Sequence, residues 1–282
     1  MTHTPLTSSL TSPPRRGAAA SVALAPLLQG PPRTGRLLGA SPAAVYLRFQ
    51  AVTGPEVVAV LPPSSVRLPL GMVVGGTLPA IAGDPTVVVG EGAVSVGEEV
   101  WVPMRWFDPR PRSLTAANPA RLVTASRLLW DLSASEVGVD TDRARHAILA
   151  LVVGEGHPTC ALLGEGPGLT PAGDDVVAGA LAACELFGHK SALQAVPEIL
   201  ARAPRATTAL SAALLSCAAA GQVVPEAARF LSALSGRGDV GTALAGLRSV
   251  GATSGTALAV GIVAALEGVA RGNRGSGGGD AI

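Results

Sequence analysis

The pattern of apolar residues changes near Asn118, and this change limits what the chain can fold into. Before that point, short runs rich in β-forming residues are separated by Gly and Pro, as in strands joined by tight turns. After it, apolar residues recur at helical spacing along longer segments. The sequence therefore predicts an α+β protein, with a β-rich N-terminal part and a helical C-terminal part.

The strand pattern occurs in several short segments at regular spacing. They are residues 44–49, 57–61, 66–73, 86–89, 93–96 and 99–102. Gly90, Gly92 and Gly97 favour hairpin connections, whereas Pro62 and Pro69 restrict the neighbouring segments to edges or bends. This arrangement predicts a small antiparallel β barrel or sandwich.

The helical pattern occurs in segments that begin or end at Gly, Pro or hydroxyl residues. They are residues 119–132, 141–153, 171–187, 191–203, 207–220, 225–234, 238–247 and 255–270. These segments predict a C-terminal helical bundle. We expect a disordered leader over residues 1–16, a β-rich domain over 17–115, a helical domain over 116–270 and a disordered Gly/Ser-rich tail over 271–282.

The charge balance and the cysteines narrow the class of protein. The 21 Lys and Arg against 20 Asp and Glu give a net charge of +1, which disfavours a nucleic-acid or anionic-membrane partner. The three cysteines make no disulfide framework, so we expect a cytoplasmic protein. Residues 250–266 are uncharged but are diluted by Thr253, Ser254 and Thr256, which favours a buried helix over a membrane span.

The most informative stretch is a glycine-rich loop that leads directly into an apolar helix. It reads Gly164-Glu165-Gly166-Pro167-Gly168-Leu169-Thr170-Pro171-Ala172-Gly173-Asp174-Asp175. Thr170 is a good N-cap, and Pro171 suits the first helical position. Gly173 is expected to leave room for a ligand, and Asp174 and Asp175 fall in the first turn, where the helix dipole stabilises carboxylates.

The helix after this loop is apolar on all sides and is therefore expected to be buried. Two acids at the edge of a core need partners, which favours a ligand site over an elaborate helix cap without a ligand. Backbone N–H groups attract anions, whereas Asp174 and Asp175 repel bare phosphate. A phosphate bridged by magnesium, held by these two carboxylates, or an amide or ureido group fits better.

A second loop of the same kind, residues 251–255, opens the other apolar helix. If the two helices start side by side, their caps form one polar site. Asp174 and Asp175 are its candidate catalytic residues. Its candidate ligand-binding residues are Gly166, Gly168, Thr170, Gly173, Thr253, Ser254 and Gly255.

Residues 164–175 resemble the signature loop of the AllH-like family, formerly a family of unknown function and later linked to oxamate carbamoyltransferase. The second loop resembles that family's later Gly-His-Ser-Ser-Gly segment, although Ala252 and Ala257 stand where a His and an acid are expected. The resemblance implies a subunit that acts with other proteins in allantoin breakdown. There a carbamoyl group moves between oxalurate or oxamate and phosphate.

The resemblance leaves two functions open. In the first, the chain is a carbamoyltransferase subunit, and Asp174 or Asp175 holds the carbamoyl NH2, acts as a base or anchors a metal. In the second, which Ala252 and Ala257 favour, the chain binds a small anion or ureido compound, or has an assembly role, without catalysis. Both functions imply other protein subunits as partners.

Overall fold

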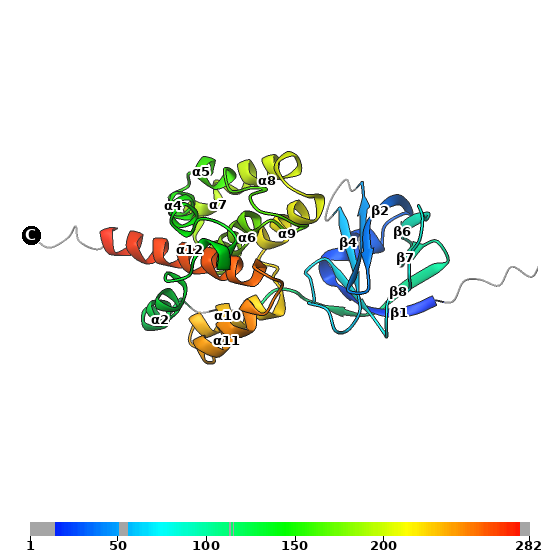
Figure 1. The fold of residues 1–282 in the computed structure, drawn as a ribbon, viewed down its shortest axis with the longest axis horizontal. Helices are drawn as coiled ribbons and strands as arrows, with labels where there is room; N and C mark the ends of the chain where they lie inside the picture. Colours follow the sequence, from blue (N-terminus) through cyan, green and yellow to red (C-terminus); the bar gives the residue numbers. More distant parts are fainter. Residues whose placement is uncertain (1–14, 51–55, 113, 115, 277–282) are drawn as a thin grey trace, which may run out of the picture.

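The chain folds as a β-barrel joined to a set of helices (Figure 1). The computed structural model describes residues 15–50, 56–112, 114 and 116–276, with side chains described up to residue 272. The expected leader lies outside the described residues up to residue 14, and the first strand begins at Arg15. Of the expected tail, residues 277–282 lie outside the described part, and residues 271–276 continue the last helix.

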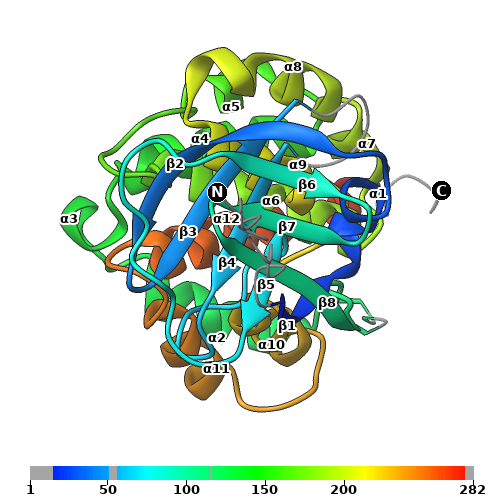
Figure 2. The same cartoon turned by 90° about the vertical axis from the view of Figure 1, so that its right-hand side faces the viewer.

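Within the described residues, eight strands close into a single barrel in the order β1-β5-β4-β3-β2-β6-β7-β8. The barrel stands in front of the helices in Figure 2. The strands are β1 (Arg15–Ser21), β2 (Arg33–Ser41), β3 (Ala44–Phe49), β4 (Val57–Leu61), β5 (Gly71–Val74), β6 (Val87–Gly90), β7 (Ala93–Val96) and β8 (Glu99–Phe107). A short 3-10 turn (Val22–Leu24) and the helix α1 (Ala25–Leu28) follow β1.

The pairing in this barrel is mixed, because β1 pairs with β8 in parallel and β4 pairs with β5 in parallel. Hairpin spacing predicts only antiparallel pairs between neighbours in the sequence. Closure of the barrel instead brings the first and last strands together, and the connection 62–70 carries the chain back along β4. The expectation of an antiparallel barrel or sandwich is therefore wrong.

Two strands, β1 and β2, carry no strand signal in the sequence, since both lack the β-branched run that marks the other strands. The strand β2 also contains Gly35 and Gly39. It nevertheless pairs with both β3 and β6, and at Gly35 a side chain would meet the Phe49 ring, since an added Cβ would lie 2.4 Å from Phe49 Cδ1. Packing against a large aromatic ring here overrides local propensity.

The helices surround a central pair, α6 and α12, which pack against each other along their length. Their bounds are α2 (Pro119–Leu129), α3 (Ala134–Val137), α4 (Thr141–Val152), α5 (His157–Cys160), α6 (Ala172–Leu186), α7 (Lys190–Leu193), α8 (Val196–Ala206), α9 (Ala209–Ala219), α10 (Pro225–Leu234), α11 (Val240–Arg248) and α12 (Ser254–Ser276). Every residue from 172 to 184 is buried. The predicted fold class, with its helical bundle, is corrected to a closed mixed barrel followed by helices around this pair.

The helix α12 is long and apolar enough to cross a membrane by length and composition over Ser254–Gly272, but 67% of that window is buried inside the fold. It packs on α6, α4 and α2. These contacts are those of a core helix. Elsewhere the expected helix over residues 191–203 is divided into α7 and α8.

The barrel and the helices meet at α9. Its residues Leu210, Ala213 and Cys217 are buried within the apolar cluster of the barrel, whereas the other buried helical residues form a separate cluster. The helix α9 also packs on α6. The start of α6 is thereby held close to the barrel wall.

Candidate functional site

The two glycine-containing loops meet, as the sequence predicts. The Thr170 Oγ1 atom, in the loop before α6, lies 3.2 Å from the Ser254 Oγ atom at the start of α12. The helices can start side by side because glycines let their backbones touch. A Cβ at Gly179 would lie 2.2 Å from the Leu258 oxygen, and one at Gly261 would lie 1.9 Å from the Val176 oxygen.

The glycines of the first loop serve its own folding. Gly164 has a φ of 78°, and a Cβ there would lie 2.2 Å from the Ala206 oxygen. Gly173 was expected to leave room for a ligand, but a Cβ there would lie 2.1 Å from the backbone oxygen of Leu162. The space beside Gly173 is therefore filled by the chain itself, and that expectation is wrong.

Thr170 does not cap α6. The N-cap is Pro171, which has no side-chain hydrogen bond to offer, and the helix begins at Ala172. The hydroxyl of Thr170 is instead paired with Ser254, while Thr208 donates to the Leu169 oxygen at 2.6 Å and fixes the loop. The predicted capping role of Thr170 is therefore wrong, and its side chain is free to contribute to the joint between the loops.

Asp174 has partners within the chain at both carboxyl oxygens, and its predicted catalytic role stays a prediction. Its side chain is 1% exposed, and its two oxygens accept hydrogen bonds from the Gly164 N–H, at 2.8 Å, and from the Thr207 hydroxyl. Burial raises the pKa of this carboxyl, and the hydrogen bonds from Thr207, Gly164 and Ser211 oppose that rise. Asp174 thus ties the glycine-rich loop and α6 to the chain between α8 and α9.

Asp175 lies in different surroundings. Its side chain is 7% exposed, the Ser254 hydroxyl hydrogen-bonds its carboxyl group, and its Oδ2 atom has no partner among the described residues. Burial raises its pKa to about 8, and the nearby charge of Asp174 adds to the rise, whereas Ser254 opposes it. At neutral pH this carboxyl is mainly protonated, so it can both donate and accept a hydrogen bond.

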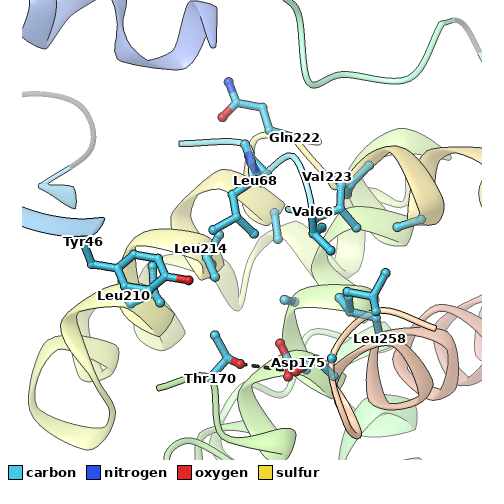
Figure 3. A pocket seen from close by; sticks show the side chains of 18 residues that line it. Tyr46, Val66, Leu68, Thr170, Asp175, Leu210, Leu214, Gln222, Val223 and Leu258 are labelled. Carbon is cyan, nitrogen blue, oxygen red and sulfur yellow. Dashed lines mark hydrogen bonds between the residues drawn. The ribbon is translucent and has the colours of Figure 1, made fainter. Parts of the chain in front are cut away.

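Asp175 faces a cavity of about 220 Å³ between the helices and the barrel (Figure 3). Thr170 and its hydrogen-bond partner Ser254 line the cavity as well, and Tyr46 of β3 reaches into it from the barrel. Most of the remaining wall is apolar, as at Leu210 and Leu258. Among the described residues that line the cavity there is no Lys, Arg or His.

The structure gathers some of the predicted site residues and separates others. Thr170, Asp175 and Ser254 line the cavity. The predicted residues that do not line it are Gly166, Gly168, Gly173, Asp174, Thr253 and Gly255. Gly255 instead allows α12 to approach α11, since a Cβ there would lie 1.8 Å from the Leu247 oxygen.

Neither Ala252 nor Ala257 lines the cavity. Ala252 is exposed on the second loop, and Ala257 is fully buried in α12.

Sequence reasoning missed Tyr46 and Gln222, which also line the cavity. Both lie far from the two loops in the sequence. The strand pattern of residues 44–49 predicts that Tyr46 lies on one face of a sheet, but nothing local pairs that face with α6. Only the docking of α9 on the barrel brings Tyr46 to the cavity.

The two aspartates do not fit as a pair of magnesium ligands. Both oxygens of Asp174 accept hydrogen bonds from the protein and this residue does not line the cavity, whereas Asp175 does, so the two carboxyl groups do not face one common site. Over the described part of the chain, no group of three or more His, Cys, Asp or Glu residues is placed to hold a metal ion.

Comparison with known proteins relates part of the chain to one family description. Residues 162–266 match the family model of the oxamate carbamoyltransferase subunit AllH. No curated protein and no solved structure matches the chain. The matched segment runs from the glycine-rich loop into α12 and so contains both helix starts, whereas the barrel lies outside it. Over residues 162–266, the AllH-like segment, the chain is therefore similar to the AllH family.

Proposed function

We propose that this chain is a subunit of a carbamoyltransferase of the oxamate type and that the cavity beside Asp175 holds the amide or carbamoyl group. The observation that carries the proposal is that Asp175 lines the cavity and that its Oδ2 atom is buried without a hydrogen-bond partner among the described residues. A buried polar atom of this kind needs a partner, and a ligand amide supplies one.

The proposed chemistry suits this carboxyl group. The carbamoyl carbon of carbamoyl phosphate bonds to the oxamate nitrogen, the bond from that carbon to the phosphate oxygen breaks, and the nitrogen loses a proton. Because the pKa of Asp175 is about 8, only its ionised fraction can accept that proton near neutral pH, and this fraction grows as the pH rises toward 8, which makes Asp175 the candidate base. Oxalurate and inorganic phosphate are the products.

Both reactants are anions, and the described lining offers them no cationic side chain. The negative charge of the reactants, and the charge that develops in the transition state, need cationic groups or hydrogen-bond donors around them. The cationic groups must then come from outside this lining. The family description names a subunit, so we propose that other protein subunits complete the site. The buried, free cysteines support our proposal that the assembly works in the cytoplasm.

The same absence of cationic side chains favours a second function. In it, the chain binds a small amide or ureido compound and takes no part in the chemistry. This alternative needs the hydrogen bond to Asp175 but no proton transfer.

The test is oxalurate formation from carbamoyl phosphate and oxamate. The tagged full chain is purified gently from its own host with the subunits that accompany it, as wild type and as Asp175→Asn. We expect the variant to lose about a hundredfold or more in rate, as for removal of a general base. The matched control is Asp239→Asn, which makes the same change at the N-cap of α11, where Asn serves equally well.

The outcomes separate the two functions. Activity that survives Asp175→Asn overturns the proposed catalytic role. A wild-type assembly that binds oxamate but makes no oxalurate favours the binding subunit. Full activity in Asp239→Asn is required before loss in Asp175→Asn is assigned to the cavity.

A further inference from the structure

The barrel contributes a polar side chain to the cavity. In β3 the residues Val45, Leu47 and Phe49 are buried in the barrel interior, so the alternating residues point outward. Tyr46 is one of these, and its neighbours across the strands are Gly39 on β2 and Ala59 on β4. These small neighbours leave the ring free to reach the helices.

The hydroxyl of Tyr46 is directed into the cavity from the left in Figure 3, and Thr170 and Asp175 lie along the lower side of the same cavity. None of the hydrogen bonds found among the described residues involves this hydroxyl. Partial burial raises the pKa of the phenol, so it remains a hydrogen-bond donor at neutral pH. It is therefore available to a bound molecule.

The cavity thus receives polar groups from both parts of the fold. Asp175 and the hydroxyls of Thr170 and Ser254 come from the helices and their loops, and the hydroxyl of Tyr46 comes from the barrel. Apolar side chains, including Leu210 and Leu214, make up most of the remaining lining. Such an arrangement orients a small planar group that has N–H donors on one edge and a carbonyl oxygen on another.

We infer that Tyr46 is a ligand-binding residue of the site, donating its hydroxyl to the carbonyl oxygen of the amide group that Asp175 holds by its N–H. The inference rests on the proposed function, since it assumes that the ligand occupies this cavity. It adds a residue from outside the AllH-like segment, and it makes the barrel part of the recognition surface.

Tyr46 is the single tyrosine of the chain, which allows a direct spectroscopic test. The full chain is labelled with carbon-13 at the tyrosine Cζ position and combined with its unlabelled accompanying subunits, so that Tyr46 gives the labelled signal, and oxamate is added as the probe. We expect oxamate to shift this signal in the wild type. In Asp175→Asn, oxamate at the same concentration should shift it less, because binding is weaker.

Affinity provides the second readout. Tyr46→Phe removes one hydroxyl and should weaken oxamate binding about tenfold by titration calorimetry, with an unchanged Tm. The matched control is Ser95→Ala, which removes a barrel hydroxyl from β7, away from the cavity, and should leave binding unchanged.

The failures can be told apart. Suppose that oxamate binds the wild type and that Asp175→Asn weakens this binding. If oxamate then leaves the tyrosine signal of the wild type unshifted, and Tyr46→Phe binds oxamate as tightly as the wild type does, this inference is overturned and the proposed function stands. If oxamate does not bind the wild-type chain with its accompanying subunits, the proposed function and the role of Tyr46 both fall.

Discussion

Asp174 and Asp175 are neighbours in the sequence, but the fold gives their carboxyl groups opposite surroundings. Asp174 has hydrogen-bond donors at both oxygens, whereas Asp175 lines the cavity and has one oxygen without a partner among the described residues. The sequence places both acids in the first turn of a buried helix, and this is confirmed. Their separate roles depend on Thr207 and Ser254, which the chain brings in from elsewhere and which no local pattern could assign.

The raised pKa of Asp175 gives stability a specific dependence on pH. Below about pH 4 the folded and unfolded chains both hold the proton, so burial carries no penalty. As the pH rises toward about 8 the unfolded chain loses this proton and the folded chain keeps it, so the stability falls. Asp175→Asn cannot ionise. We therefore compare the Tm of Asp175→Asn with that of the wild type at each pH. The Tm of the variant minus the Tm of the wild type should be larger at about pH 8 than at about pH 5, by roughly 4 °C or more.

Thermal unfolding of both proteins over that pH range checks the prediction. Parallel curves for variant and wild type would contradict the buried, protonated state of Asp175. Asp174→Asn serves as the comparison variant. Gly164 and Thr207 each donate a hydrogen bond to a different oxygen of Asp174, whereas the amide of Asn has a single acceptor oxygen. That variant should be less stable than the wild type, by about 1–3 kcal/mol.

At the scale of the elements, the pair α6 and α12 decides where the site lies. The sequence predicts two buried apolar helices with adjacent starts, and the contact between Thr170 and Ser254 confirms the adjacency. The sequence does not reveal which glycines allow α6 and α12 to approach so closely, because from their local sequence Gly179 and Gly261 are only weak helix formers. Their function is visible only when the carbonyl oxygens of the partner helix are in place.

A methyl group at Gly261 should separate these helices. Its Cβ would lie 1.9 Å from the Val176 oxygen, so Gly261→Ala requires the backbones to move apart. We expect the free energy of unfolding to fall by about 1–3 kcal/mol, measured by urea denaturation. Gly246→Ala, on the exposed side of α11 with no atom within 4 Å, is the matched control and should raise it by about 0.5–1 kcal/mol. A stabilised Gly261→Ala would refute the close packing of the pair.

At the scale of the whole molecule, the cavity belongs to neither part alone. Asp175 comes from the helices and Tyr46 from the barrel, and α9 holds the two parts together. The switch from strand pattern to helical pattern could be predicted because both patterns are local. Barrel closure through parallel β1 and β8, and the burial of one face of α9 against the barrel, depend on contacts between distant residues. The periodicity of apolar residues along the sequence does not predict such contacts.

This arrangement makes α9 the element whose disruption should uncouple the two parts. Ala213 is 7% exposed and lies in the barrel cluster, so Ala213→Asp places an unpaired carboxylate there. We expect a loss of about 3 kcal/mol and, in calorimetry, separate unfolding of the barrel and the helices, since their apolar clusters are distinct. Ser216→Asp adds the same charge on the exposed face of α9 and should change the stability by less than about 0.5 kcal/mol. Equal Tm values for Ala213→Asp and the wild type would show that α9 does not join the barrel to the helices, and the cavity would then lose the wall that Tyr46 provides.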